Sequence, residues 1–277
     1  MSDRAAPGAG APTELEVPTP EAEWDALAAA WADSPTQHFL RAWSDAANAA
    51  LLERVLGELR PARALKTDLF DEAVASGIYP HLRELARSVA GVDVSPTVIA
   101  AARSRYPELE AHRCDVRRLP FRDGEFDFVF SNSTLDHFST KREIAAAIAE
   151  LARVLAPGGR LVVTLDNPLN PLIALRNALP FGLLNRTGLV PYFVGATCGP
   201  RSLRRMFMQA GLDVEGIDTV MHFPRAVAAV VVAIAARVGD PAQLRLLKLL
   251  HACERLHTLP SRLVTGHFIA ASGRKRR

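Results

Sequence analysis

One short apolar stretch, Val89–Val94, constrains the fold of this chain more than any other part of its sequence. It shows no polar alternation before Asp93, which is typical of a strand buried on both faces of a parallel sheet. Ser95 and Pro96 follow at once and predict a capped helix start, because proline at the first helical position loses no hydrogen bond. Asp93 would thus lie at the strand's carboxyl end, where open α/β sheets hold ligands. Two roles remain open for it: binding ribose hydroxyls, or helping to cap the next helix.

Strand and helix patterns alternate on both sides of this stretch. Apolar runs predict strands at 63–70, 89–94, 110–114, 126–131, 160–165, 212–221 and 265–271. Helical periodicity predicts helices at 80–88, 95–105, 141–155, 201–210, 225–238 and 241–256. The alternation favours an α/β fold: a doubly wound, mostly parallel seven-stranded sheet with helices on both faces and right-handed crossovers. Pro157-Gly158-Gly159 is interpreted as the stop signal of the 141–155 helix.

The same patterns divide the chain into segments. Residues 1–20, rich in proline, alanine and glycine, are expected to be a disordered tail. Residues 21–59 predict two amphipathic helices that either pack on the main domain, 60–273, or roof its ligand cleft. Segment 166–200 holds five prolines and predicts an irregular insertion used as a lid or binding segment. Residues 274–277 form a basic tail that we expect to be solvated.

Bulk properties restrict the classes of partner. The 277 residues carry a net charge of only +3, which does not indicate a nucleic-acid partner. The three cysteines are far apart, which suits a reducing cytoplasm and predicts neither disulfides nor a metal site. The N-terminus lacks a signal-peptide pattern, and the most apolar helix is shorter than the about 20 residues that span a bilayer. We therefore expect a cytoplasmic protein without stable membrane insertion.

Four motifs, in order, carry a family resemblance. They are Gly91-Val92-Asp93-Val94-Ser95-Pro96, Cys114-Asp115-Val116 with Leu119-Pro120-Phe121, Gly124-Glu125-Phe126-Asp127-Phe128-Val129, and Glu150-Leu151-Ala152-Arg153-Val154-Leu155-Ala156-Pro157-Gly158-Gly159. With these motifs the sequence resembles the class I S-adenosylmethionine-dependent methyltransferases over about residues 60–166. The resemblance is to their small-molecule, type 11-like branch, with a Rossmann-like methyltransferase fold.

The resemblance implies S-adenosylmethionine as cofactor and a role for each matching residue. Asp93, with Val94 beside it, would bind the ribose hydroxyls. Asp115 would bond the adenine amino group, and Val116 would pack near the ring. The methionine and methyl-transfer end would be lined by the polar residues that leave the fourth strand, Ser131, Asn132 and Ser133. Asp127 and the Pro157-Gly158-Gly159 stop receive scaffold roles only.

The first motif departs from the family pattern. The family's first strand ends in an acidic residue and a glycine-rich turn, whereas this chain has Lys66 near the acidic position and no glycine before Gly77. Side chains there would obstruct the usual backbone approach to the cofactor. Asp68 or Glu72 replaces the lost carboxylate and holds the cofactor's ammonium, or the loop takes another path, or cofactor binding has been lost. We favour the first hypothesis because Asp93 and Asp115 are both present.

Two polar clusters are candidates for the transfer chemistry. His137 titrates near neutrality and is the candidate base, with Asp136 beside it; the alternative is that both only begin a helix. Asp166 and Asn167, after the fifth strand, would orient an acceptor, unless they only form a turn before Pro168. Further candidates for acceptor contact, without a motif, are Tyr192 in the insertion and His222 after the sixth strand.

Three functions were weighed. The first is an S-adenosylmethionine-dependent methyltransferase acting on a small organic acceptor by in-line displacement. The second is a non-catalytic relative that uses the fold as an interaction or regulatory module, suggested by the missing glycine turn. A nicotinamide oxidoreductase is disfavoured, because no Gly-x-Gly-x-x-Gly follows the first strand.

Overall fold

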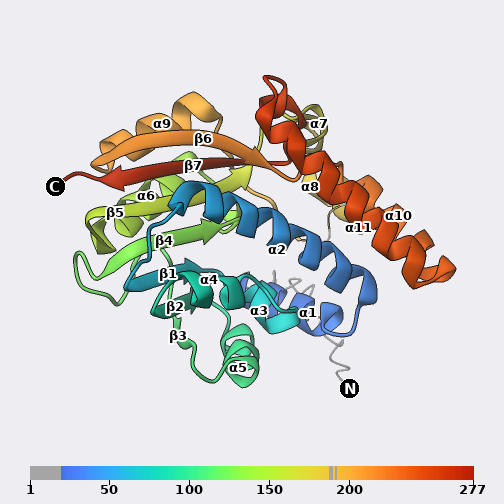
Figure 1. The fold of residues 1–277 in the computed structure, drawn as a ribbon, viewed down its shortest axis with the longest axis horizontal. Coiled ribbons are helices and arrows are strands. Elements are labelled where there is room, and N and C mark those ends of the chain that lie inside the picture. The colour runs from blue at the N-terminus through green and yellow to red at the C-terminus, as the bar shows by residue number, and fades with distance from the viewer. Residues whose placement is uncertain (1–19, 187–189, 191) are drawn as a thin grey trace, which may run out of the picture.

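The computed structural model describes residues 20–186, 190 and 192–277, which form an α/β fold of three layers (Figure 1). Residues 1–19 of the expected tail lie outside the described residues. The described strands are β1 Arg63–Thr67, β2 Ser88–Asp93, β3 Glu110–Arg113, β4 Phe126–Asn132, β5 Leu155–Asp166, β6 Leu212–Val220 and β7 Phe268–Lys275. The helices are α1 Pro20–Trp31, α2 Pro35–Leu56, α3 Phe70–Val74, α4 Tyr79–Leu85, α5 Pro96–Arg105, α6 Lys141–Val154, α7 Pro171–Ala178, α8 Phe181–Arg186, α9 Pro200–Gln209, α10 Arg225–Val238, α11 Asp240–Cys253 and α12 Arg262–Thr265, with 3₁₀ turns at Leu135–His137 and Glu254–Thr258.

The strands form one sheet in the order β3-β2-β1-β4-β5-β7-β6. Strands β1 to β5 pair in parallel, and β7 runs antiparallel between β5 and β6. The predicted mostly parallel, doubly wound sheet is confirmed. The carboxyl ends of β1, β2, β3 and β4 consequently meet at one edge, which places the residues after each strand near one another.

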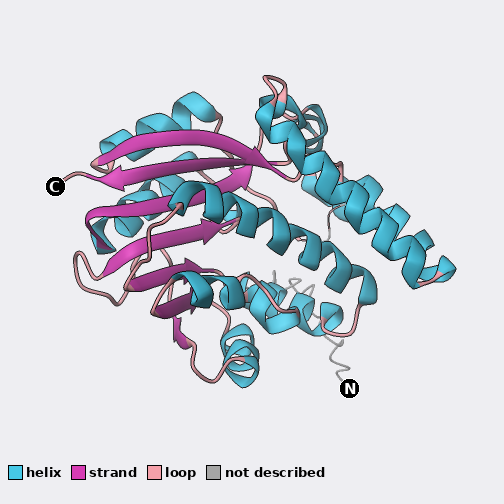
Figure 2. Ribbon diagram, in the orientation of Figure 1, coloured by secondary structure: helices cyan, strands magenta, loops and turns pink. Residues whose placement is uncertain are grey.

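The apolar strands are explained by a core on each face of the sheet. Ala64, Phe128 and Val162 pack in one core, whereas the next residue in each strand packs in the other. Because side chains alternate across a strand, both faces must be apolar to be buried. Helices α2, α10 and α11 contribute to the first core, and α6 and α9 to the second, so helices flank both faces (Figure 2).

Local capping explains where the helices that bound the site begin. Ser95 caps α5 by accepting the Val98 N–H, with Pro96 as the first helical residue. Thr140 and Glu143 form a reciprocal capping box at the start of α6. These short-range bonds fix the start of α5 directly after β2, and the start of α6 after the 3₁₀ turn that follows β4.

Three segments differ from the sequence expectation. The 166–200 insertion contains α7 and α8 and is not wholly irregular, because Asn170 caps α7 and Pro171 occupies its first turn. Pro157-Gly158-Gly159 does not cap a helix but lies inside β5, which begins at Leu155 directly after α6 and is irregular in its pairing with β4.

The basic tail is the third difference. The last strand starts three residues later than predicted and continues to Lys275, because β7 pairs with strands on both of its sides. Arg274 bonds Glu215, Lys275 donates to the Leu155 carbonyl, and Arg276 bonds Asp213. Arg274 and Arg276 are 49% and 55% exposed, so these charges are solvated as expected, although the chain here also extends the sheet.

Helices gather beyond the carboxyl edge of the parallel strands (Figure 1). Helix α1 packs against α3 and α5, and α10 packs against α2 and α11. The helices at this edge therefore form walls around the strand ends.

Within the described part of the chain, no helix has both the length and the apolar character that a bilayer crossing requires.

Candidate functional site

A cavity of about 520 Å³ opens at the carboxyl edge of β1, β2 and β3. This volume falls in the range of about 300–1,000 Å³ typical of small-molecule sites. The residues that line it come from the strand ends, α1 and the start of α6: Trp24, Thr67, Asp68, Phe70, Val92, Asp93, Val94, Cys114, Asp115, Val116, Arg117, Thr134, His137, Phe138, Ser139 and Glu143. Five of the eight predicted cofactor-binding residues are in this set: Asp68, Asp93, Val94, Asp115 and Val116.

Asp93 lines the cavity at the carboxyl end of β2. One of its oxygens accepts the Leu69 N–H at 2.9 Å and the other accepts the Ser95 N–H at 2.9 Å. Burial, and then the nearby Asp68 charge, raise the pKa of Asp93 to about 7. Each oxygen retains a lone pair for a donor in the cavity. Asp93 therefore shapes the start of α5 and faces the cavity, so its two predicted roles are compatible.

Asp115 follows β3 and faces the same cavity. Arg117 binds both of its carboxylate oxygens, with distances of 2.6 and 3.0 Å, and also bonds Glu143 at 2.7 Å. These bonds hold the pKa of Asp115 below its usual value although burial acts in the opposite direction. Val94 and Val116 line the cavity on either side, which provides apolar walls beside two carboxylates.

The loop after β1 contains a buried ion pair in place of a glycine turn. The Lys66 ammonium lies 2.8 Å from the Glu72 carboxylate, with the two side chains 2% and 0% exposed. Burial alone would lower the pKa of Lys66, but Glu72 and Asp68 together raise it. Glu72 also accepts the Tyr79 N–H at 3.0 Å. Lys66 and Glu72 thus hold the loop from inside.

Asp68 and Glu72 have different positions, although sequence reasoning treated them as equivalent. Glu72 does not line the cavity, because its carboxylate turns inward to Lys66 and packs against Gly77. Asp68 lines the cavity, and its backbone adopts φ 65°, a conformation usually left to glycine. Its side chain accepts the Phe70 N–H at 2.8 Å. The geometry therefore narrows the choice of substitute carboxylate to Asp68.

The candidate base, His137, lies in the 3₁₀ turn after β4 and lines the main cavity. Its Nδ1 is 3.1 Å from the Phe193 carbonyl oxygen, so Nδ1 carries the proton in the neutral ring and Nε2 keeps its lone pair. Asp136 is 2% exposed and accepts bonds from the Asp166 N–H and the Ser133 hydroxyl. Burial raises the pKa of Asp136 to about 6. Asp136 lies beside His137, with 3.9 Å between its Oδ1 and the ring Nε2, and does not line the cavity.

A smaller chamber of about 50 Å³ adjoins the main cavity and shares four lining residues with it: Trp24, Asp68, Phe70 and His137. Aromatic rings surround this shared part. The Trp24 ring lies 4.7 Å from that of His137 and 5.5 Å from that of Tyr192, measured between centroids. The remaining lining residues are Trp31, Arg41, Ser44, Asp71, Asn132, Ser133, Tyr192, Arg225 and Phe268. The N-terminal helices thus roof the site with Trp24 and Trp31, whereas Trp43 is in the core.

Six predicted site residues line neither space: Glu72 and Asp136, described above, and four others. Ser131 is fully buried and accepts the Thr67 hydroxyl at 2.9 Å. Asn167 is also fully buried and donates to the Leu263 and Gly266 carbonyls, which ties β5 to α12. Asp166 bonds Arg176 and lies 3.6 Å from His267, whose pKa burial lowers to about 4. His222 contacts the Thr265 hydroxyl at 2.8 Å.

Sequence reasoning missed other lining residues. Thr67, Phe70 and Arg117 lie within two residues of a predicted site residue, so the strand-end rule could have found them. Arg41 and Arg225 had no such signal, because they come from α2 and the start of α10, at opposite ends of the chain.

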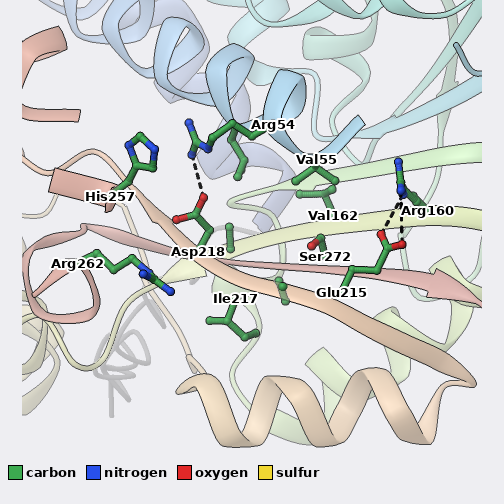
Figure 3. Close-up of a pocket in the computed structure, with 14 residues that line it drawn as sticks. Arg54, Val55, Arg160, Val162, Glu215, Ile217, Asp218, His257, Arg262 and Ser272 are labelled. Carbon is green, nitrogen blue, oxygen red and sulfur yellow. Dashed lines mark hydrogen bonds and ion pairs between the residues drawn. The ribbon is translucent and has the colours of Figure 1, made fainter. Parts of the chain in front are cut away.

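A second cavity, of about 550 Å³, lies on the sheet face between α2 and β6 (Figure 3). Two of its arginines are paired across it: Arg54 with Asp218 at 2.9 Å, and Arg160 with Glu215 at 2.9 Å. It contains none of the predicted site residues and lies away from the carboxyl strand ends. No group of three or more possible metal-binding His, Cys, Asp or Glu side chains occurs in the part of the chain that the structure describes. The strand-end cavity is therefore the candidate site.

Comparisons with known proteins agree with this geometry. Residues 73–163 match the family model described as "Methyltransferase domain", of type 11. The chain is 30% identical over 200 residues to a malonyl-[acyl-carrier protein] O-methyltransferase of Halorhodospira halophila, covering 70% of this chain and 66% of that protein. It is 45% identical over 73 residues to the Probable tRNA methyltransferase 9B of Bos taurus, covering 26% of this chain and 16% of that protein. The chain thus spans less than two thirds of the length of these curated relatives.

Among solved structures, the fold is similar to that of the N-methyltransferase NodS from Bradyrhizobium japonicum in complex with S-adenosyl-L-homocysteine. The TM-score is 0.55 at 13% identity, and the match covers 92% of this chain and 100% of that one. The fold, the four ordered motifs and the family model agree, and the chain belongs to the class I S-adenosylmethionine-dependent methyltransferases, in their type 11 branch.

Proposed function

We propose that this protein transfers a methyl group from S-adenosylmethionine to a small organic acceptor by in-line displacement. One observation carries the proposal: Asp93 and Asp115, from neighbouring strand ends, line one cavity that continues into an aromatic chamber beside His137. The cofactor's nucleoside would occupy the main cavity, and an acceptor that faces the cofactor's methyl group would occupy the chamber. A cytoplasmic location is supported by three cysteines that are free and far apart in the sequence: Cys114, Cys198 and Cys253.

The nucleoside half of the cofactor fits the residues present. Asp93 keeps a lone pair on each oxygen after its two backbone bonds, which is what two ribose hydroxyls require. Asp115 and the walls of Val94 and Val116 would accommodate the adenine. Asp115 shares its charge with Arg117, so its bond to the adenine amino group would be weaker than that of a free carboxylate.

The methionine half also fits, by a different route from the family's glycine turn. Asp68 presents a carboxylate to the cavity, where it would bind the cofactor's ammonium. Because Asp68 itself adopts φ 65°, the loop follows a path of the kind that glycine normally allows. Lys66 supports this path by donating to the Asp68 carbonyl.

The remaining residues position and deprotonate the acceptor. S-adenosylmethionine, when bound, supplies a methyl group on a positively charged sulfur and leaves as S-adenosylhomocysteine. Trp24, Phe70 and Tyr192 exclude water around the acceptor and restrict its orientation. His137 accepts the proton of an acceptor hydroxyl or amine at Nε2, while its Nδ1–H remains bonded to Phe193. Asp136 is a positioning residue. When its carboxyl group is ionised, the negative charge stabilises the protonated His137 ring.

A small acceptor is favoured over a nucleic acid. The match to the tRNA methyltransferase relative covers only 73 residues, which is 26% of this chain and 16% of that protein. A relative matched over 70% of this chain is named malonyl-[acyl-carrier protein] O-methyltransferase. A chamber closed by tryptophan and tyrosine rings suits an organic group of modest size.

A second candidate is a non-catalytic interaction module, favoured by the Lys66–Glu72 pair in the loop where the family pattern has a glycine-rich turn. Cofactor binding alone would suit either candidate. Incubation with methyl-labelled S-adenosylmethionine and a fractionated cell extract separates them. Transfer of label that requires His137 supports the enzyme, whereas cofactor binding without transfer supports the module.

Calorimetry with S-adenosylhomocysteine is the direct test of the proposed site. We expect saturable binding that weakens about a hundredfold in Asp93→Ala, because two bonds to a charged group are lost. Asp213→Ala, an exposed carboxylate on β6 paired with Arg276, is the matched control and should bind as the wild type does. Absence of binding at millimolar ligand would refute the proposal.

A further inference from the structure

The exposed large apolar side chains of this protein are concentrated in one part of the chain. Among the described residues there are 14 of them, and 12 lie between residues 169 and 264. A single exposed apolar residue needs no explanation, but a group of them marks an interaction surface. We call these 12 side chains the exposed apolar group: Leu169, Leu172, Leu175, Leu179, Leu183, Val227, Val230, Ile234, Leu244, Leu249, Leu259 and Val264.

The elements that carry the exposed apolar group contact one another in turn. Asn170, which caps α7, donates to the carbonyls of Thr265 and Gly266 and so joins the insertion to the end of α12. Helix α12 contacts the 3₁₀ turn Glu254–Thr258, this turn contacts α11, and α11 packs against α10. Figure 1 shows these helices at the end of the molecule that lies beyond the carboxyl edge of the parallel strands.

Helix α10 is apolar on the side that faces away from the core as well as on the side that faces it. Residues 226–236 are all alanine, valine or isoleucine. Ala228 and Val232 are buried in the core, whereas Val230 and Ile234, on the opposite side of the helix, are 60% and 53% exposed. A helix that is apolar all round is normally buried in protein or in a membrane. With 14 residues, α10 is shorter than the about 20 that cross a bilayer, so its outer side suits a membrane surface.

The insertion shows the same pattern on α7. Leu172 and Leu175, and Leu179 directly after the helix, recur at three- and four-residue steps and so lie along one side. Leu172 and Leu175 are 53% and 61% exposed, whereas Ile173, on another side of the helix, is 3% exposed. Leucine is among the residues that helices at a membrane interface place on their apolar face. The insertion thus adds a second apolar stripe to that of α10.

The charges around the exposed apolar group are mainly positive. Residues 167–200 contain two arginines and no acidic residue, and residues 219–267 contain six arginines and lysines against two acidic residues. One of these two, Glu254, turns inward and accepts two backbone N–H groups. Arg245 and Lys248 on α11 are exposed, and neither is in an ion pair within the part of the chain that the structure describes. These charges are therefore available to an anionic partner.

We propose that the exposed apolar group docks the protein on the surface of an anionic lipid bilayer. The leucine, valine and isoleucine side chains would enter the interface between headgroups and acyl chains, and the neighbouring arginines and lysines would contact headgroup phosphates. Charge complementarity selects this occupant. A second copy of the chain on the same surface would instead bring positive charge against positive charge. The inference goes beyond the proposed methyl transfer and does not depend on it.

Co-sedimentation of the full chain with lipid vesicles, without cofactor, tests the inference. The vesicles consist of phosphatidylcholine alone or of an equal mixture of phosphatidylcholine and phosphatidylglycerol. We expect at least about tenfold tighter binding to the anionic vesicles, because each arginine or lysine near an anionic surface adds roughly fivefold. Raising the salt concentration to about 1 M should remove most of this difference, since salt screens exposed charges.

Two double variants separate the apolar contribution from the charged one. Leu172→Gln with Leu175→Gln removes two leucines that are more than half exposed, and it should weaken binding to anionic vesicles about tenfold or more. Arg245→Gln with Lys248→Gln should weaken binding to anionic vesicles about twentyfold and leave binding to neutral vesicles unchanged. Circular dichroism of each variant confirms that the fold is retained.

Helix α9, which packs against α6 on the other face of the sheet, supplies matched controls. Met208 is 53% exposed and Arg204 is also exposed, so each resembles a changed residue in type and exposure. Met208→Gln and Arg204→Gln should both bind vesicles as the wild type does.

Three results would overturn the inference. The first is a wild-type protein that binds neither kind of vesicle. The second is vesicle binding that both double variants retain in full, because the contact would then lie elsewhere on the molecule. The third is a dimer in sedimentation velocity that the leucine variant abolishes, without any vesicle binding, because a second copy would then cover the exposed apolar group. Since no cofactor is present, none of these results bears on the proposed methyl transfer.

Discussion

The two halves of the main cavity reach the same edge of the sheet by different means. At the ends of β2 and β3, Asp93 and Asp115 stand at the positions at which the family pattern has them. At the end of β1, a buried lysine and glutamate replace the family's acid and glycines. The first half presents side-chain carboxylates to the cavity. The second depends on the path of the backbone, which different residues can produce.

The close approach that glycine usually provides in the loop occurs here on the neighbouring strand. A Cβ on Gly91 of β2 would lie 2.6 Å from the Leu69 side chain, so Leu69 fills space that only a glycine leaves free. Asp68 takes the positive φ, and Lys66 and Glu72 close the loop from within. The comparison indicates that a buried ion pair and a residue with positive φ can shape the loop where the family pattern has glycines.

The largest expected effect is on stability, from breaking the buried pair. Glu72→Gln leaves the Lys66 ammonium, 2% exposed, without a counter-charge. We expect the free energy of unfolding to fall by about 3–5 kcal/mol, measured by urea denaturation. Glu215→Gln is the matched control: this carboxylate is 32% exposed and pairs with Arg160 and Arg274, so its loss should cost about 0–1 kcal/mol.

The double variant Lys66→Met, Glu72→Leu shows whether the charges themselves are needed. Replacing both members by apolar residues of similar size should recover most of the stability lost in Glu72→Gln. Cofactor binding should persist, because Asp68 still faces the cavity. A Glu72→Gln variant within about 1 kcal/mol of the wild type would mean that the pair is hydrated and does not hold the loop.

A smaller effect should show that the loop after β1 binds the methionine part of the cofactor and not its nucleoside. Asp68→Asn removes the charge, and asparagine tolerates the φ of 65° at this position. Affinity for S-adenosylhomocysteine should fall about tenfold, because one charge-assisted bond to its ammonium is lost. Affinity for 5′-methylthioadenosine, which has no amino-acid tail, should not change. Equal losses for both ligands would place Asp68 against the nucleoside and contradict the division.

The nucleoside half should also respond to pH. The pKa of Asp93 is raised to about 7, so the protonated form is favoured in the folded protein, and its contribution to stability is lost as pH rises through 7. Ribose hydroxyls donate to the ionised carboxylate, so cofactor affinity depends on pH in the opposite direction from stability. Affinity for S-adenosylhomocysteine should fall by up to about tenfold per pH unit below 7. The dependence should disappear in Asp93→Asn, and a flat wild-type profile between pH 6 and 8 would contradict it.

The regular part of the fold could be predicted because its signals are local. The apolar run before Asp93, the Ser95 cap and the periodic face of α6 each fix an element from adjacent residues. The end of β7 was misjudged because the charges of Arg274 and Lys275 suggested a tail outside the sheet, whereas both residues pair with neighbouring strands.

The parts of the site that sequence could not predict depend on distant contacts. Glu72 was a candidate ligand from its place in the loop after β1. Its inward turn could not be predicted, because it depends on Gly77, where a Cβ would lie 2.4 Å from the Glu72 carboxyl carbon. Arg41 and Arg225 line one chamber because α2 and α10 pack together, and no local sequence pattern predicts that contact. Asn167 and His222 have polar side chains at strand ends, but both are used in hydrogen bonds that join β5 and β6 to the segment before β7.

The smallest effect concerns the bond that Arg117 makes within the nucleoside half. Asp115 and Arg117 are 38% and 39% exposed, so solvent weakens their attraction, and the pair is worth about 0–1 kcal/mol. Arg117→Gln frees the Asp115 carboxylate for the adenine amino group, and it also removes the charge that lowers the pKa of Asp115. We expect affinity for S-adenosylhomocysteine to rise by at most about fivefold. Affinity for the analogue with inosine in place of adenosine, which has no amino group, should not rise. A loss of affinity for both ligands would instead mean that the Arg117 side chain itself packs against the nucleoside, and the adenine would then be held by Arg117 and not by Asp115.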